Sequence, residues 1–287
     1  MHYYYIHTIS YYVNNNRVDN IKYCIDNLNK IKYSKNINSN EKILFIIGCI
    51  YDELTENIKN TFDKFQTLNT ELLDIKVIYR MNTGGTIKTM DNALNYVTEN
   101  NITSNYFGVF EDDSFYNLDN HLIFDTVDKH FNNNMDIVGC QVLEGRHDIL
   151  YKDGYKVFKK QWCNNRQKNQ LAPWIKEKHL YINSNSEKLV DDNLIKWIDG
   201  ALYITTIEKL KKIKKKLIKL TLAPENKKYT HCEHGINYGE VGFPTRLSIN
   251  GFNFFGLSHN MPHYCPSNYK NVYFQYLNLN SIGNKTI

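Results

Sequence analysis

The sequence has few cysteines and no long apolar stretch. Its six cysteines are widely spaced and form no Cys-x-x-Cys pair, so neither a zinc site nor a disulfide framework is indicated. No window approaches the roughly 18 apolar residues that a membrane-spanning helix needs. Residues 1–10 lack the basic segment and long apolar core of a secretory signal. We therefore expect a cytoplasmic protein that is soluble or at most peripheral to a membrane.

The chain also lacks a strong excess of charge of either sign. It has 35 Lys and Arg against 30 Asp and Glu, a net charge of +5 over 287 residues, which is far from the strongly basic surface of a nucleic-acid-binding protein. Hydrophobic residues make up 42% and charged residues 23%, values typical of a folded globular chain. The length suits one α/β domain with an elaborated second half.

Strand and helix patterns alternate through the first 113 residues. Apolar and β-branched segments predict strands, and apolar residues three or four positions apart predict helices between them. The expected strands are 3–10, 43–50, 75–79 and 106–110, with helices after residue 17, up to residue 65 and over 90–97. A further helix is expected at 118–131 and a strand at 136–142. This alternation predicts a mostly parallel central sheet of the doubly wound type, flanked by helices.

The fourth expected strand ends in three adjacent carboxylates, Glu111, Asp112 and Asp113. Three adjacent acids repel one another unless a cation or a sugar hydroxyl lies among them, although a solvated acidic turn is an alternative. The strand before it ends in a turn with two glycines, residues 82–86. Because ligands bind outside the carboxyl ends of parallel strands, the turn and the acids together suggest a nucleotide-diphosphate site.

These residues resemble glycosyltransferases of the GT-A fold, particularly the family 2-like group, which carries an Asn and Gly pair after the third strand and an Asp-x-Asp-type motif after the fourth. Here the motif reads Glu111-Asp112-Asp113, similar to the Glu-Asp-Asp of collagen-type and lipooligosaccharide sugar transferases. The resemblance implies a single Rossmann-like GT-A domain over residues 1–287, with a nucleotide-sugar half to about 115 and an acceptor half from about 116. It also implies a nucleotide-sugar donor, UDP-linked in the favoured case, and Mn²⁺ or Mg²⁺.

The resemblance places donor contacts at the strand ends. Donor-binding residues are expected at Thr8, Ser10, Asp52, Asn82, Gly84, Gly85, Glu111, Asp112, Asp199 and Gly200. Asp52 occupies the position of a base-binding acid, or else it is the N-cap of the following helix. Asp199 and Gly200 look like the family's glycine loop, or else they form a β-bulge with a capping Asp. The metal is expected on Glu111, Asp113 and His259, with His263 as a second candidate for the histidine.

The acceptor half contains a second motif of the same family. In family 2-like enzymes an acidic pair is followed by Arg-Leu at six and seven residues and by Gly and an aromatic at eleven and twelve. Counting from Glu240 gives Arg246, Leu247, Gly251 and Phe252. Glu240 therefore occupies the catalytic position, but its partner is Gly239. Glu233 either supplies the missing acid or is itself the base.

The resulting hypothesis is an inverting, metal-dependent glycosyltransferase that acts on a hydroxyl of a glycan, lipid-linked or protein acceptor. Two alternatives stay open. The departures at Gly239 and Glu111 suggest a catalytically degenerate carbohydrate-binding protein of the same fold. A sugar nucleotidyltransferase is less favoured, because Tyr11–Arg17 is not the Gly-rich signature that it needs. The Lys-rich helix expected at 206–222 is either a surface helix or a peripheral membrane contact.

Overall fold

A computed structural model describes residues 1–30, 41–82, 85–116, 123–139, 142–146, 194–198, 203–213, 247, 252–256 and 274–276.

Four parallel strands form the centre of the molecule. They are β1 (His2–Tyr12), β2 (Lys42–Tyr51), β3 (Leu73–Met81) and β4 (Thr103–Glu111). Their order in the sheet is β4-β1-β2-β3, and every neighbouring pair runs parallel. β1 is therefore central and is flanked by β2 on one side and β4 on the other. All four strands lie where the sequence pattern predicts them.

Three short strands extend the sheet beyond β4. These are β9 (Tyr203–Thr205), β6 (Ile137–Gly139) and β10 (Phe254–Gly256), which complete a seven-stranded sheet. β9 is antiparallel to both β4 and β6, whereas β10 and β6 are parallel. The predicted mostly parallel α/β sheet is thus confirmed.

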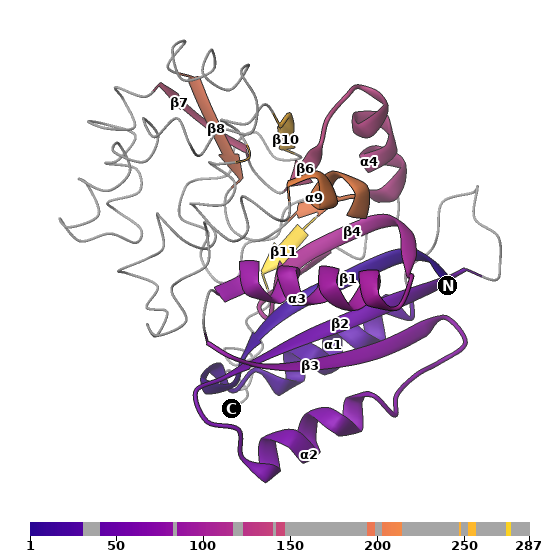
Figure 1. Cartoon of the computed structure of the whole chain (residues 1–287), viewed down its shortest axis with the longest axis vertical. Helices are drawn as coiled ribbons and strands as arrows, with labels where there is room; N and C mark the ends of the chain where they lie inside the picture. Colours follow the sequence, from indigo (N-terminus) through magenta and orange to yellow (C-terminus); the bar gives the residue numbers. More distant parts are fainter. Residues whose placement is uncertain are drawn as a thin grey trace, which may run out of the picture.

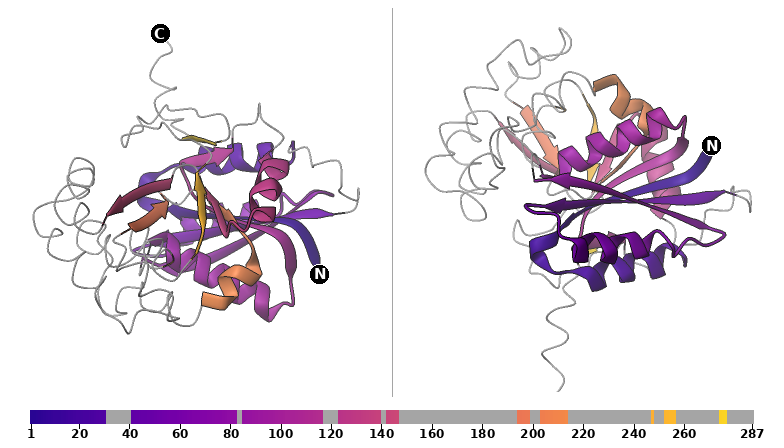
Figure 2. Two further views of the ribbon diagram at one scale, coloured as in Figure 1. Left: turned by 90° about the horizontal axis from the view of Figure 1, so that it is seen from above. Right: turned by 60° about the horizontal axis from the view of Figure 1, so that its bottom comes forward.

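Helices cover both faces of this sheet (Figures 1 and 2). The helices α1 (Val18–Leu28) and α2 (Glu56–Phe65) lie on one face, and α3 (Gly85–Glu99) lies on the other. The short helix α9 (Ile207–Ile213) shares the face of α3, and α4 (Ile123–Asn132) packs into the core on the face of α1. This arrangement follows from the apolar stripe on each helix, which can be buried only against the sheet.

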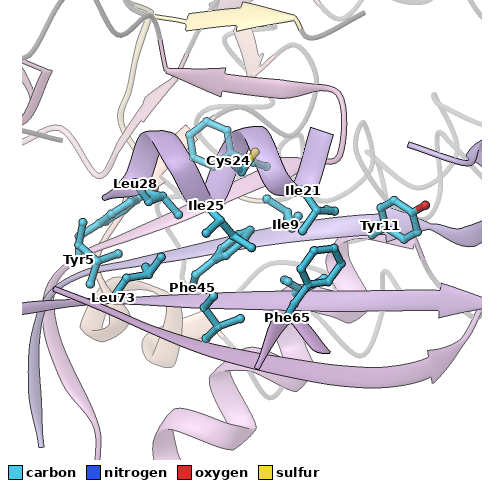
Figure 3. Close-up of a cluster of buried hydrophobic side chains, with 14 of the residues drawn as sticks. Tyr5, Ile9, Tyr11, Ile21, Cys24, Ile25, Leu28, Phe45, Phe65 and Leu73 are labelled. Atoms are coloured by element: carbon cyan, nitrogen blue, oxygen red, sulfur yellow. The ribbon is translucent and has the colours of Figure 1, made fainter. Parts of the chain in front are cut away.

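Alternation along the strands produces one apolar cluster on each face. On β2, Phe45, Ile47 and Cys49 face α1 and α2, whereas Leu44 and Ile46 face α3. Figure 3 shows the α1 side, where Ile21, Cys24, Ile25 and Leu28 of the helix pack on β1 and β2. Because β2 is buried on both faces, its sequence is a continuous run of apolar residues and does not alternate between apolar and polar ones.

The chain reverses its direction of winding between β1 and β4. The connections from β1 to β2 and from β2 to β3 pass through α1 and α2 on one face, and the connection from β3 to β4 passes through α3 on the other. β4 then pairs on the free side of β1. In open α/β sheets such a switch point, at the carboxyl ends of the strands, is where ligands bind.

The remaining described elements differ in part from the expected ones. A 3-10 turn, η1 (Val13–Asn15), follows β1. β5 (Ser114–Tyr116) pairs with β11 (Phe274–Tyr276), and β7 (Val142–Arg146) pairs with β8 (Leu194–Ile198).

Three predicted elements lie partly within the described residues. Residues 123–131 of the predicted helix at 118–131 fall within α4, and residues 137–139 of the predicted strand at 136–142 form β6. Of the Lys-rich helix at 206–222, residues 207–213 are described, as α9. No described helix has both the length and the apolar character needed to cross a bilayer.

Candidate functional site

The three carboxylates of the acidic motif point in different directions. Glu111 is the last residue of β4, on the α3 face, where its Oε1 accepts a hydrogen bond from the Thr86 hydroxyl at 2.8 Å. Asp112 points to the opposite side, toward the start of α1, because successive side chains of an extended chain alternate. Asp113 lies next to it with 29% of its side chain exposed. The three carboxylate side chains of the motif therefore do not all point to the same side of the sheet.

Arg17 supplies a positive charge to two of these acids. Its Nη1 atom donates to Asp112 Oδ1 and to Asp113 Oδ2, both at 2.9 Å. Arg17 immediately precedes α1, and the aspartates follow β4, so this contact joins the two chain segments that leave the sheet at the switch point. From the sequence, a cation, a sugar hydroxyl or solvent could lie among the three acids; in the structure a guanidinium of the same chain contacts two of them.

Asp112 is an anchor between β4 and the segment after β1. Only 1% of it is exposed, and its second oxygen, Oδ2, accepts a hydrogen bond from the backbone N–H of Tyr12 at 3.1 Å. Its backbone C=O accepts from the Asn20 side-chain amide at 2.8 Å. Burial, reinforced by the nearby Asp113 charge, raises the pKa of Asp112 to about 7, and Arg17 opposes this rise.

The turn between β3 and α3 is held by a second arginine. Arg80 is 6% exposed, and its guanidinium donates to the carbonyl oxygens of Met81 and Gly85 and to the hydroxyl of Thr89. Gly85 has a φ of 53°, in the left-handed region that favours glycine. The second glycine of the predicted Gly-Gly turn is thus required by the backbone, and Arg80 fixes its position.

Small and polar side chains line the sheet beneath the first turns of α3. A Cβ atom built on Gly48 of β2 would lie 2.3 Å from the Thr89 methyl carbon, so glycine lets α3 approach this strand. The neighbour of Gly48 on β1 is Ser10, which is completely buried. Two residues earlier on β1, the buried Thr8 hydroxyl donates to the Gly108 C=O at 2.8 Å.

Two of the predicted donor-binding residues carry buried polar atoms that lack a hydrogen-bond partner. These are Ser10 Oγ, at the end of β1, and Asn82 Oδ1, just after β3, when partners are sought among the described residues. The backbone N–H of Asn82 donates to the C=O of Tyr51 at 3.2 Å, which keeps the residue at the sheet edge. Buried polar groups nearly always have a partner, so each of these atoms keeps an unused capacity for a hydrogen bond.

Asp52 follows β2 at the same edge of the sheet. Its Oδ2 accepts a hydrogen bond from the Asn14 side-chain amide at 3.2 Å. The alternative that Asp52 caps the next helix is wrong, because Thr55 is the N-cap of α2 and accepts from the Ile58 N–H at 3.4 Å. Asp52 is exposed and lies beside the segment that follows β1.

The carboxylates fit a divalent cation by charge and by donor type. Glu111, Asp112 and Asp113 against Arg17 leave two negative charges in excess when all are ionised, and carboxylate oxygens suit Mg²⁺ and Mn²⁺. Within the described ranges no three Asp, Glu, His or Cys side chains form a cluster that could hold a metal. Ions of this kind commonly bind through one or two carboxylates together with substrate phosphates.

Several predicted site residues lie outside the described residues. They are Gly84, Asp199, Gly200, Glu233, Glu240 and His259, together with the alternative histidine His263. Their assignments stay predictions.

Sequence reasoning missed Arg17 and Arg80. Arg17 appeared only as part of a segment that ends the first strand, and Arg80 only as part of the turn after the third. The signal that was present is position, because each is an isolated arginine within seven residues of the carboxyl end of a predicted strand. Isolated cations at that edge are expected to serve either a ligand or a turn.

No protein-family model matches the sequence, and no curated protein matches it at a significant level. Among solved structures, the chain is similar to the mannosyltransferase Ktr4p from S. cerevisiae in complex with GDP, with 14% sequence identity and a TM-score of 0.27. The match covers 71% of this chain and 57% of that one, so this chain spans less than two thirds of the mannosyltransferase chain. We therefore derive the function from the residues described above.

Proposed function

We propose that this protein is a glycosyltransferase that binds a nucleotide-sugar donor at the carboxyl ends of β1–β4 and transfers the sugar to an acceptor hydroxyl. The observation that carries the proposal is the position of the acidic motif. Glu111–Asp113 stand at the end of β4, beside the end of β1, at the one place where the doubly wound part of the sheet changes its winding direction.

Three further features support donor binding at this edge. Gly85 and Gly48 bring the N-terminal turn of α3 close to the sheet, and backbone N–H groups at a helix start favour phosphate. The two unpaired polar atoms, Ser10 Oγ and Asn82 Oδ1, lie at ends of the same parallel strands. Asp52, exposed at the end of β2, would accept hydrogen bonds from a nucleobase. A UDP-linked donor is favoured by the family resemblance.

The proposed metal would be held by Asp113 and Glu111. When bound, such an ion neutralises the diphosphate as negative charge develops on it. The chain's own residues have separate tasks: Asp112 and Arg17 hold Asp113 in place, and Thr86 orients Glu111.

Glu240 is proposed to take the proton from the acceptor hydroxyl as that oxygen attacks the anomeric carbon. The bond to the diphosphate then breaks, and a base on the side opposite the leaving group gives inversion of configuration. Glu233 is the alternative base. The acceptor is expected to be a glycan, a lipid-linked sugar or a protein hydroxyl, bound by the second half of the chain, and the Lys-rich segment 206–222 is a candidate membrane contact.

A ligand screen followed by an activity assay tests this function. The purified protein is incubated with UDP-, GDP-, CMP- and dTDP-sugars, with Mn²⁺ or EDTA, and its melting temperature is recorded because a bound ligand raises it. Each stabilising donor is then tested for slow hydrolysis in the absence of acceptor. We expect one nucleotide class to stabilise the protein in Mn²⁺ and its sugar to be released.

A different outcome would favour the carbohydrate-binding alternative. Stabilisation by free glycans, with no stabilisation or hydrolysis of any nucleotide sugar, would show that the fold has lost its donor site. Release of pyrophosphate from a nucleoside triphosphate and a sugar phosphate would instead indicate a nucleotidyltransferase.

A further inference from the structure

The guanidinium of Arg17 is only partly used by its contacts with the acidic motif. Both hydrogen bonds that it makes to described residues involve Nη1, at 2.9 Å to each aspartate. Its Nε and Nη2 groups are not part of these bonds, and 30% of the side chain is exposed. An arginine presents its N–H donors in a planar fork that matches phosphate oxygens.

Arg17 is also held in place before any ligand arrives. The backbone on its N-terminal side is tied to β4 by the hydrogen bond from the Tyr12 N–H to Asp112 Oδ2. On its C-terminal side, the Asn20 amide donates to the Asp112 C=O. A side chain fixed in this way loses little conformational freedom on binding an anion.

The balance of charges at the site favours a cationic side chain that can bind phosphate. When all three carboxylates are ionised, they outnumber Arg17 by two charges, which a divalent ion would neutralise. A diphosphate would then meet a neutral site in which Arg17 is the charged hydrogen-bond donor on the β1 side. Without the guanidinium, the same site would be negative and would repel the phosphates.

We propose that Arg17 is a phosphate-binding residue of the donor site, anchored through Nη1 to Asp112 and Asp113 and presenting its remaining N–H donors to the diphosphate. This inference rests on the proposed function, because it concerns the donor of that reaction. It assigns the segment after β1 a direct part in holding the leaving group, beside the aspartates that follow β4.

The test separates contact with phosphate from a purely structural role by varying the number of phosphates. Wild type, Arg17→Lys and Arg17→Gln are titrated calorimetrically in Mn²⁺ with uridine, UMP and UDP and with guanosine, GMP and GDP. Lys22→Gln serves as the control, since Lys22 is an exposed cation on the same helix. Because Arg17→Gln leaves a buried carboxylate unpaired and could unfold the protein, the double variant Arg17→Gln/Asp112→Asn is measured beside it.

We expect wild type to gain affinity from nucleoside to diphosphate, and Arg17→Gln to lose roughly tenfold or more of its diphosphate affinity while nucleoside affinity stays unchanged. The double variant should show the same loss, Arg17→Lys a smaller one, and Lys22→Gln none. Two results would overturn the role of Arg17 while leaving the proposed function in place. One is an equal loss of affinity for nucleoside and for diphosphate, and the other is a diphosphate affinity in the glutamine variants that equals that of wild type. If wild type binds the diphosphate no more tightly than the nucleoside, both the proposed function and the role of Arg17 fail.

Discussion

Arg80 and Thr89 are joined by two hydrogen bonds, from Nε at 3.1 Å and from Nη2 at 2.8 Å to the same threonine hydroxyl. The first residue belongs to β3 and the second to α3, so this contact closes the turn between them. The buried guanidinium also binds the carbonyl oxygens at both ends of that turn, those of Met81 and Gly85. The shape of the predicted phosphate-facing turn therefore depends on one arginine.

Arg80→Met should lower the free energy of unfolding by about 2–4 kcal/mol, because it leaves the buried Gly85 carbonyl and Thr89 hydroxyl and the part-buried Met81 carbonyl without their donor. Urea denaturation followed by circular dichroism measures this change. Lys59→Met is the control, since Lys59 is an exposed cation on α2, and its effect should stay within about 0.5 kcal/mol. A similarly small effect for Arg80→Met would mean that the turn does not need the guanidinium.

Gly48→Ala should destabilise the protein by about 1–3 kcal/mol, the usual range for overpacking a buried site. The added Cβ would lie 2.3 Å from Thr89 Cγ2 and 2.6 Å from Thr89 Oγ1, so α3 would have to move away from β2. The double variant Gly48→Ala/Thr89→Ala removes the atoms that collide. If the clash is the cause, the loss in the double variant will be smaller than the sum of the two single losses.

The alternation of strands and helices could be predicted because each element is encoded by its own residues. The apolar run at 43–50 and the helical spacing of Ile21, Cys24 and Leu28 need no knowledge of the rest of the chain. The acidic motif was equally visible, because a buried strand that ends in three acids is unusual.

Contacts between distant segments could not be predicted in the same way. Arg17 and Asp112 are 95 residues apart, and they meet only because β1 and β4 are neighbours in the sheet. Local rules also failed where two similar residues compete for one role. Asp52 and Thr55 are both good N-caps, and only the geometry of the loop after β2 selects Thr55.

Asp112 should make stability depend on pH. Its pKa is about 7 in the folded protein and about 4 in an unfolded chain, so the folded state binds more protons between these values. The contribution of this group to the free energy of unfolding therefore falls as pH rises from about 4 to about 7, by at most about 1.4 kcal/mol per pH unit.

Urea denaturation of wild type and Asp112→Asn at several pH values from 4.5 to 7.5 measures this dependence. Asparagine does not titrate, so the stability of the variant relative to wild type should increase with pH. Asp19→Asn, which changes an exposed aspartate on α1, is the comparison variant. Parallel profiles for wild type and Asp112→Asn would contradict the raised pKa.

Glu240→Gln should leave donor affinity within about twofold of wild type while lowering the turnover of transfer by roughly 100-fold or more, as expected for loss of a general base. Calorimetry with the donor and an assay of product formation separate the two effects. Glu233→Gln is the matched variant seven residues earlier in the sequence. If Glu240→Gln keeps its activity and Glu233→Gln loses it, the base is Glu233.

The central claim is that the acids after β4 bind the donor's diphosphate through a divalent ion. Its most direct test is calorimetry of UDP and GDP, in Mn²⁺ and in EDTA, with wild type, Asp113→Asn and the exposed control Asp19→Asn. We predict that wild type and the control bind one of the two nucleotides in Mn²⁺, and that Asp113→Asn loses at least about tenfold in affinity, or about 1.4 kcal/mol. Equal affinity of Asp113→Asn and wild type in Mn²⁺ would contradict the account.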